Sequence, residues 1–345
     1  MTSSKSNNRK NVGDRRATAK EVAKLAGVSI SAVSRTFTSG ASVSSGTREK
    51  VIAATRSLGY QPNALARSLM TKRTELIALI SNNFDNPMFM EVFDLFTRRL
   101  QQRGRRPLLA NLSGGARTDV ALEMLLKYSV DGVIVASSTL SPEFTEQCAA
   151  AGMPVVRAFG RPDGAASGNI VGCDNYQGGR VAGEMLRDRG YKNIAFLGGP
   201  QSATSTEDRL RGLRESLVVK GLEPCAVVFG HSYCHSAGYT LMKELLRNGG
   251  IDVVFCGDDV LAMGAIDACR EAGARVPQDV GVMGFNDMAM SAWSSYNLTT
   301  IHQPVADIII TAVELLLNIV DQSAEKKVMR LFECHAVERG TLRPP

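Results

Sequence analysis

From Ala17 to Arg73 the sequence reads ATAKEVAKLAGVSISAVSRTFTSGASVSSGTREKVIAATRSLGYQPNALARSLMTKR. Thr18 and Glu21 have the spacing of a capping box, in which both side chains satisfy unpaired backbone N–H groups at the start of a helix. Apolar residues at helical spacing follow, and Gly27 permits the left-handed backbone that ends a helix in a tight turn. The pattern predicts a helix that begins at Thr18 and buries Val22, Leu25 and Ala26.

Two more helices follow in the same stretch. Ser29 can cap a short helix that runs to Phe37, with Val33 turned inward, and a third helix is expected from about Ser45 to Leu58. Two short helices joined by a Gly-Val-Ser turn form the helix-turn-helix plan, whose second helix enters the DNA major groove. On pattern alone a generic three-helix bundle is the alternative. The third helix should close a small core with Val51, Ala54 and Leu58.

Charge favours the DNA-binding interpretation. Residues 1–75 contain 14 Lys and Arg against 4 Asp and Glu, a net charge of +10, whereas the remaining 26 basic and 30 acidic residues give −4. A basic segment on a mildly acidic body is the electrostatic pattern of a phosphate-binding module, which gains free energy by releasing counterions from the nucleic acid. Double-stranded DNA is therefore the expected partner of the N-terminal part.

The composition of the other segments limits their roles. Residues 1–16 are almost free of apolar side chains, so we expect a disordered basic tail without the apolar centre of a secretory signal. The run IIITAVELLLNIV is too short for a membrane span and carries Glu314, so no membrane contact is expected. Seven scattered cysteines without a CxxC pair favour reduced thiols and a cytoplasmic location. His231, Cys234 and His235 are too few to make a zinc site the favoured interpretation, and no metal is expected.

From Glu75 onward, short apolar runs alternate with amphipathic helical patterns. The candidate strands are Leu76–Ile80, Leu108–Asn111, Gly132–Ala136, Val155–Ala158, Ile194–Gly198, Val227–Phe229, Val253–Cys256 and Val280–Gly284. Helical patterns include Met88–Arg103, Thr118–Tyr128, Tyr176–Arg189, Asp208–Lys220, Ala237–Asn248 and Val260–Ala272. Repeated strand-helix units predict parallel sheets covered by helices on both faces. The strands fall into two sets on either side of about Asn175, so we expect two similar doubly wound α/β lobes with a cleft where strand ends converge.

Nearly the whole chain from Ala17 to about Arg339 resembles one protein family. The motifs that carry the resemblance are EVAKLAGVSISAVSR, VSSGTREKVIAATRSLGYQPNALARSL, NPMF, MPVV, DNYQGG, NIAFLGGP, GDDVLAMGAIDA, RVPQDVGVMGFND and LTTIHQPV, in the family's order and spacing. The chain is thereby identified as similar to the lactose and galactose repressor family of bacterial transcription regulators. Their core shares its fold with periplasmic sugar-binding proteins.

The resemblance implies a domain plan. It comprises a helix-turn-helix domain at 17–62, a hinge helix or linker at 63–74, and an effector-binding and dimerisation core at 75–345. Because the chain crosses between lobes more than once in this fold, we expect lobe one at about 75–174 plus 304–328, and lobe two at about 175–303 plus 329–340. By the same resemblance the protein is a homodimeric repressor that binds a pseudo-palindromic operator.

Residues that match the family's DNA-contacting segment lie in the recognition helix and the hinge. A leucine of the hinge wedges into the minor groove in this family, which bends the duplex at a cost in base stacking. In the recognition helix, Ile30 can contact a thymine methyl and Arg35 can reach guanine O6 and N7. The expected DNA-binding residues are Thr18, Ser29, Ile30, Ser31, Ser34, Arg35, Asn63, Arg67 and Leu69.

Residues that match the family's effector pocket are mostly polar. An aromatic face can stack on a sugar or base, and the fork of Arg209 can hold vicinal hydroxyls or a carboxylate. Asp258 stands where the family usually has Asn, and Asn286 where it usually has Asp, so a relative's effector does not transfer directly. The expected effector-binding residues are Asn83, Phe89, Arg161, Arg209, Asp258, Asn286 and Gln303.

Such a pocket favours a small-molecule effector that is a sugar or sugar acid, and no cofactor. A purine-responsive repressor stays an alternative, as does a sugar-binding protein of a transport system, although the latter should have an export signal and no basic helical head. An enzyme is not expected, because the sequence has no GxSxG, Walker loop, HExxH or strand-associated GxGxxG.

Overall fold

The structure is a computed structural model, and it describes residues 17–38, 41–61, 68, 71–115, 117–161, 168–322 and 327–344. The chain divides into two compact units, Met1–Thr74 and Glu75–Pro345. We call the first unit the head and the second the core. The expected basic tail at 1–16 lies outside the described residues.

The head contains three helices, α1 (Ala19–Ala26), α2 (Ile30–Thr36) and α3 (Ser45–Leu58). The predicted capping box is present: Thr18 N donates to Glu21 Oε2 over 2.7 Å, and Glu21 N donates to Thr18 Oγ1 over 3.4 Å. Gly27 ends α1 with φ of 65°. The small core consists of Val22, Ala23, Val33, Val51 and Ala54.

Two predicted core leucines of the head are exposed instead. Leu25 is 55% exposed and Leu58 is 37% exposed. Ala23 and Ala54 lie in the core beside Val22 and Val51, so α1 and α3 each contribute a valine-alanine pair, and α2 contributes Val33. Because these core side chains are small, the interior of the three-helix unit is narrow. Leu25 and Leu58 lie at the edge of this interior.

Lobe one of the core has a six-stranded sheet in the order β11-β5-β4-β3-β1-β2, and all of its strand pairs are parallel. Its strands are β1 (Leu76–Ser81), β2 (Arg106–Asn111), β3 (Gly132–Ala136), β4 (Val155–Ala158), β5 (Asn169–Cys173) and β11 (Met329–Phe332). Its helices are α5 (Met88–Gln102), the short 3-10 helix η1 (Ser113–Gly115), α6 (Thr118–Lys127), α7 (Pro142–Ala150) and α12 (Val305–Gln322).

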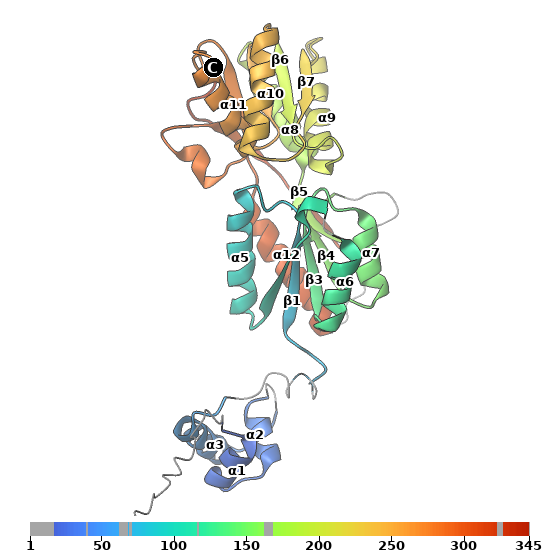
Figure 1. Ribbon diagram of the computed structural model, residues 1–345, viewed down its shortest axis with the longest axis vertical. Coiled ribbons are helices and arrows are strands. Elements are labelled where there is room, and N and C mark those ends of the chain that lie inside the picture. Colours follow the sequence, from blue (N-terminus) through green and yellow to red (C-terminus); the bar gives the residue numbers. More distant parts are fainter. Residues whose placement is uncertain are drawn as a thin grey trace, which may run out of the picture. The chain divides into compact units, whose positions relative to one another are not determined.

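Alternate residues of β1 supply the two faces of this sheet, as expected of a buried central strand. Ile77 and Leu79 belong to the core that includes Phe96 of α5 and residues of α12. Ala78 and Ile80 belong to a separate core with residues of α6 and α7. Figure 1 shows α5 and α12, and α6 and α7, beside this sheet.

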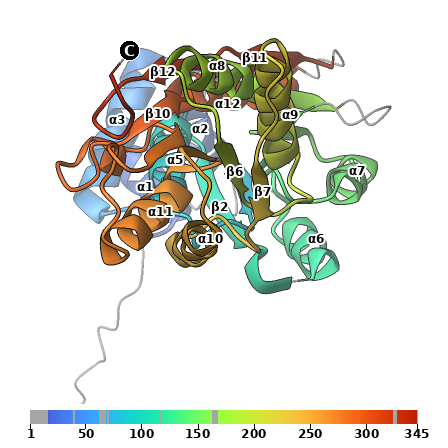
Figure 2. The ribbon, with the colours of Figure 1, turned by 90° about the horizontal axis from the view of Figure 1, so that it is seen from above.

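Lobe two has a second six-stranded sheet in the order β12-β10-β9-β8-β6-β7, parallel except for the β10–β12 pair. Its strands are β6 (Ile194–Gly198), β7 (Ala226–Phe229), β8 (Val253–Cys256), β9 (Gly281–Asn286), β10 (Thr299–His302) and β12 (His335–Val337). Its helices are α8 (Asn175–Asp188), α9 (Thr204–Val218), α10 (His235–Asn248), α11 (Asp259–Glu271) and the 3-10 helix η2 (Ala289–Ala292). Figure 2 shows α8 and α9 on one side of β6 and β7, and α10 and α11 on the other.

The chain passes between the lobes three times, after β5, after β10 and after β11. One expected boundary is wrong: 329–340 was assigned to lobe two, but β11 pairs in parallel with β5 of lobe one, and only β12 joins the second sheet. The sequence of a strand of only four residues does not indicate which of the two sheets the strand will join. The predicted fold class, two parallel-sheet α/β lobes preceded by an all-α head, is confirmed.

Helices α8 and α9 approach closely because glycines lie between them. A Cβ on Gly212 would stand 2.0 Å from the carbonyl oxygen of Tyr176, and one on Gly179 would stand 2.2 Å from that of Arg209. The close approach sets the position of Arg209 against the start of α8. Among the described residues, no helix is long and apolar enough to cross a membrane.

Candidate functional site

The head presents a polar surface on α2. Ser29 caps the helix by accepting from Ala32 N over 3.2 Å, and its hydroxyl also bonds the Ser31 hydroxyl over 2.8 Å. Ile30 is 52% exposed, and Arg35 is exposed on the same short helix. Ser34 is half-buried. An exposed branched apolar residue beside hydroxyls and a guanidinium can contact base edges and phosphates together.

The remaining predicted DNA-contacting residues are Thr18, before α1, and three residues of the hinge. Thr18 is exposed, but its hydroxyl is also 2.9 Å from Glu21 Oε2 within the capping box. Asn63, Arg67 and Leu69, the predicted hinge residues, lie outside the described residues.

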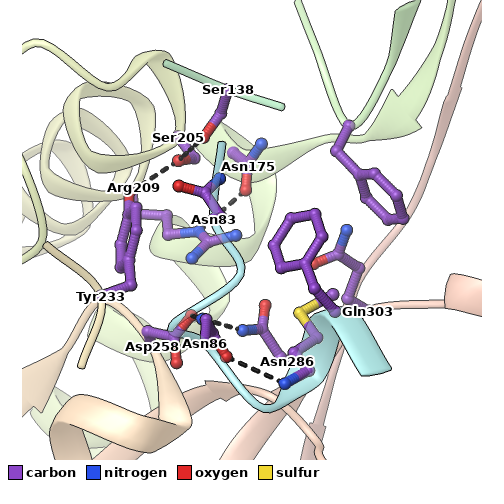
Figure 3. Close-up of a pocket in the computed structure, with 13 residues that line it drawn as sticks. Asn83, Asn86, Ser138, Asn175, Ser205, Arg209, Tyr233, Asp258, Asn286 and Gln303 are labelled. Atoms are coloured by element: carbon purple, nitrogen blue, oxygen red, sulfur yellow. Dashed lines mark hydrogen bonds between the residues drawn. The ribbon is translucent and has the colours of Figure 1, made fainter. Parts of the chain in front are cut away.

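A pocket lies between the two lobes of the core, where strands of both sheets end (Figure 3). It comprises about 420 Å³ of space not filled by protein atoms, part of it open to solvent. Six of the seven predicted effector residues line it, all except Arg161. The lining residues are Asn83, Asn86, Met88, Phe89, Ser138 and Phe159 from lobe one, Asn175, Ser205, Arg209, Tyr233, Asp258 and Asn286 from lobe two, and Gln303 from a crossover.

Arg209 of α9 is the cation of the pocket. Its side chain is buried, with Nε donating to Asn175 Oδ1 over 2.8 Å and Nη1 donating to the carbonyl of Gly257. The guanidinium lies 3.6 Å from the ring centroid of Phe285, in a cation–π contact. Within the described part of the chain Nη2 makes no hydrogen bond, so this amino group can bind a ligand oxygen.

Asp258 is the buried carboxylate of the pocket and caps α11. Its Oδ1 accepts from Val260 N over 2.9 Å, and its Oδ2 accepts from the side-chain amides of Asn86 over 2.9 Å and Asn286 over 2.8 Å. Burial raises the pKa of Asp258 to about 7, and the neighbouring Asp259 adds to the increase, while Val260 N–H and Arg209 oppose it. The carboxyl group therefore changes its charge near neutral pH.

Aromatic rings and free amides complete the lining. Phe89 and Phe159 from lobe one are in edge contact, with centroids 6.4 Å apart. The Tyr233 hydroxyl bonds Ser205 Oγ over 2.8 Å and Thr206 Oγ1 over 2.6 Å. The side-chain amides of Asn83 and Gln303 make no hydrogen bond with another described residue, so both are available to a ligand.

Polar contacts join the lobes around this pocket. Asn86 of lobe one bonds Asp258 of lobe two, and Ser205 Oγ donates to Ser138 Oγ over 3.1 Å. Figure 3 shows both bonds crossing from one lobe to the other. These contacts hold the lobes together on either side of the ligand space.

The prediction for Arg161 does not match the structure. Its guanidinium binds Glu207 over 2.6 Å and also binds Asp208, both at the start of α9, and Arg161 does not line the pocket. Phe159, with φ of 64°, lines the pocket at the end of β4 instead. Arg161 thus forms an ion-pair link from lobe one to lobe two.

Several lining residues were not predicted from the sequence. Ser138, Phe159, Asn175 and Tyr233 each come within four residues of the carboxyl end of a strand, which is where ligands bind in parallel sheets. That position was the signal available for them. The others missed are Asn86, Met88 and Ser205.

Two family models match the chain. The model for bacterial regulatory proteins of the lacI family matches residues 18–63, and the model for a periplasmic binding protein-like domain matches residues 184–342. The first covers the helix-turn-helix segment, and the second covers most of lobe two together with α12.

Known proteins match along nearly the full length. The chain is 32% identical to the HTH-type transcriptional regulator CelR of Thermobifida fusca, over 94% of this chain and 98% of that protein. It is 33% identical to the sucrose operon repressor of Pediococcus pentosaceus, over 88% and 92% of the two chains. It is 31% identical to the HTH-type transcriptional repressor PurR of Pasteurella multocida, over 91% of this chain and 95% of that protein. All three relatives are named as regulators rather than enzymes.

Solved structures agree with these matches. The lac repressor dimer bound to operator and the anti-inducer ONPF superposes with a TM-score of 0.85 at 28% identity, covering 95% of this chain and all of that one. The complex of the regulator CelR with cellobiose superposes with a TM-score of 0.72 at 30% identity, covering 94% of this chain and all of that one.

Proposed function

Because the chain belongs to the lacI family of bacterial DNA-binding transcriptional repressors, we propose that it controls genes of carbohydrate use in response to a sugar or sugar acid. The effector binds in the pocket between the two lobes, and the protein binds a pseudo-palindromic operator as a homodimer. The observation that carries this proposal is the pocket itself, whose polar side chains come from both lobes.

The chemistry of the pocket supports a polyhydroxylated effector. Amides of Asn83 and Gln303 provide both donors and acceptors, Arg209 Nη2 provides a charged donor, and Asp258 provides an acceptor. Aromatic faces suit the apolar side of a sugar ring. A sugar acid would place its carboxylate on Arg209, while a neutral sugar would place vicinal hydroxyls there.

Operator binding is assigned to α2 of the head. Arg35 and Ile30 contact base edges, and the serines of the helix contact phosphates and bases. Asn63, Arg67 and Leu69 are assigned to the hinge on family resemblance alone. Effector binding changes the relation between the lobes and thereby operator affinity, and a coupling of about 1 to 3 kcal/mol suffices for a switch of roughly 5- to 150-fold.

A purine effector is the second candidate. The chain is 31% identical to the HTH-type transcriptional repressor PurR of Pasteurella multocida, and Phe89, Phe93 and Phe159 form an aromatic group that could stack on a base. The two effector classes would use different side chains. A sugar would bind the side-chain amides of Asn83 and Gln303, whereas a purine base would stack on the aromatic rings.

The test is thermal melting of the full chain with a panel of cellobiose, sucrose, glucose, gluconate and the purine bases. A ligand that binds only the folded state raises stability by RT ln(1 + [L]/Kd), about 2.7 kcal/mol at a hundredfold excess over Kd. We expect a shift with a carbohydrate. A shift with purines alone would establish the second candidate and refute the first.

A pair of variants locates the binding. Asn83→Ala should abolish the ligand shift with little change in the melting temperature of free protein, because this half-buried amide has no hydrogen bond to another described residue. Asn248→Ala, at the exposed end of α10, should leave the shift intact. Equal shifts in both variants would place the ligand outside this pocket.

A further inference from the structure

A second cavity lies at the outer edge of lobe two. It is formed by α9 and the edge strand β7, which Figures 1 and 2 show side by side. It comprises about 720 Å³ of space not filled by protein atoms, part of it open to solvent, against about 420 Å³ for the interlobe pocket. We call it the α9–β7 groove, and its lining residues are Gln201, Glu207, Leu210, Arg214, Val227 and Phe229. The interlobe pocket is lined by other residues.

Three side chains give the groove an apolar surface. Leu210 of α9 is 7% exposed and belongs to the core of the lobe, whereas Val227 and Phe229 of β7 are half-buried and pack against that core. The ring of Phe229 is in edge contact with Phe196 of β6, with centroids 6.4 Å apart. Because packing already holds these side chains, an apolar ligand that fits the groove would cover apolar surface with little loss of side-chain freedom.

The two charged residues of the groove differ in their partners. Glu207 binds Arg161 of lobe one over 2.6 Å, so its charge is compensated. Arg214 is exposed and makes no hydrogen bond or ion pair with another described residue. The groove therefore presents one uncompensated guanidinium beside its apolar surface. A guanidinium can bind a carboxylate through two parallel N–H bonds.

The groove also shares a residue with the contact between the lobes. Glu207, Leu210 and Arg214 are three and four residues apart, so they form one stripe along α9. Glu207 lines the groove at one end of this stripe and also binds Arg161, which comes from lobe one. A ligand in the groove therefore contacts a side chain that joins the lobes.

We propose that the α9–β7 groove is a second ligand site, which binds a small carboxylate with an aromatic body. The carboxylate binds Arg214, and the aromatic body packs on the three apolar side chains. By contacting Glu207 in the position that binds Arg161, the ligand stabilises the present arrangement of the lobes. Neither the site nor this effect depends on the function proposed above, because neither requires an effector in the interlobe pocket or an operator.

The first experiment titrates the full chain with phenylacetate in ligand-observed NMR. Two comparison compounds are phenylacetamide, an uncharged molecule of the same shape, and acetate, which lacks the aromatic body. We expect phenylacetate to bind with a Kd in the low millimolar range, phenylacetamide to bind about fivefold more weakly, and acetate to show no binding. Equal affinities for phenylacetate and phenylacetamide would overturn the carboxylate assignment.

Variants then locate the bound phenylacetate. Arg214→Gln should weaken phenylacetate about fivefold and leave phenylacetamide unchanged, and its melting temperature should match wild type because Arg214 is exposed. Lys220→Gln, which removes an exposed charge beyond the end of α9, is the matched control and should change neither affinity.

The interlobe pocket also contains a cation and aromatic rings, so it needs its own control. Asn83→Ala, which alters that pocket, should leave phenylacetate binding intact. An unchanged phenylacetate affinity in Arg214→Gln would overturn the proposal. A loss of affinity in Asn83→Ala would instead place the anion in the interlobe pocket and would overturn it as well.

The second experiment tests the effect on the lobes by amide hydrogen exchange. With phenylacetate at several times its Kd, exchange should slow about fivefold in α9 and, to a smaller extent, at 159–161 of lobe one. In Arg161→Gln the ligand should still slow exchange in α9 but no longer at 159–161. Slowing at 159–161 that persists in this variant would refute transmission through the ion pair, and unchanged exchange in α9 of wild type would count against the site itself.

Discussion

The head and the interlobe pocket carry polar side chains in opposite ways. On α2 of the head the predicted DNA-contacting side chains of Ser31 and Arg35 are exposed, and Ile30 is 52% exposed. In the pocket Arg209 is 5% exposed and Asp258 is 3% exposed, and each is held by hydrogen bonds from several elements. In the head, the predicted DNA contacts Ile30 and Arg35 are exposed, while the caps at Thr18 and Ser29 stabilise the helices. In the pocket, Arg209 and Asp258 line the ligand space and also hold the surrounding elements together. Substitutions should therefore separate DNA binding from stability at Ile30 and Arg35, and couple ligand binding to stability at Arg209 and Asp258.

The head and the pocket also differ in how far apart in the sequence their hydrogen-bonded residues lie. The capping box of the head joins residues three apart, whereas the Asn86–Asp258 bond joins residues 172 apart. The local contacts of the head can form with little loop closure, while those of the pocket require both lobes to be complete.

The largest expected effect tests the packing behind the pocket. Gly212→Ala would place a Cβ 2.0 Å from the Tyr176 carbonyl and force α8 and α9 apart, so we expect a loss of at least about 4 kcal/mol of core stability. Gly46→Ala in α3 of the head is the matched control, because nothing lies within 4 Å of its Cβ position, and it should be stabilising by up to about 1 kcal/mol. Calorimetry of both variants measures how each substitution changes the free energy of unfolding. Similar changes in the two variants would contradict the expected difference between core and head.

The second effect concerns the charge of Asp258. Its folded pKa of about 7 lies above the unfolded value near 3.9, so the folded state binds the extra proton and this group's contribution to stability is lost as pH rises from about 4 to about 7. The change should amount to a few kcal/mol. The melting temperature of wild type minus that of Asp258→Asn should fall over this pH range and become constant above it. A constant difference throughout would show that Asp258 is ionised across the whole range.

The sequence was most informative where a signal was local. The cap at Thr18, the Gly27 turn and the central strands β1, β3, β6 and β8 could be predicted, because capping spacing and runs of apolar residues are properties of neighbouring residues. Strands β5, β10, β11 and β12 lie at or near sheet edges and were not predicted. For β11 even the lobe was wrong, since its partner β5 is about 160 residues away.

The pocket shows the same limit. Asn83, Phe89, Arg209, Asp258, Asn286 and Gln303 were predicted by position in motifs, and the structure places all six around one space. Arg161 was predicted on the same basis, but two acidic residues of α9 bind it. Nothing in the neighbourhood of Arg161 in sequence indicates that Glu207 and Asp208 lie within reach. A motif thus predicts which residues lie near the cleft. Which of these residues face the cleft depends on the other side chains that can bind them, as Glu207 and Asp208 bind Arg161.

The third effect should appear in DNA binding without a change in stability. Arg35→Ala should weaken binding to an operator selected from random DNA by wild-type protein, by about 1 to 3 kcal/mol, and should relax the preference at one base pair. The melting temperature should not move, because Arg35 is exposed on α2. Lys24→Ala, exposed on α1, is the control for charge alone. A uniform loss on all sequences in both variants would reduce Arg35 to a phosphate contact.

The smallest effect tests whether Thr18 breaks the separation of function from stability in the head. Its hydroxyl accepts from Glu21 N and lies 2.9 Å from Glu21 Oε2, so Thr18→Val should cost about 1 kcal/mol through the lost cap, and amides of α1 should exchange about fivefold faster. Thr18→Ser keeps the hydroxyl and should restore slow exchange. If Thr18 also contacts DNA, the valine variant should lose operator affinity at temperatures where the head is still fully folded. If affinity falls only as α1 unfolds, the hydroxyl acts through the cap, and the DNA-binding role belongs to α2.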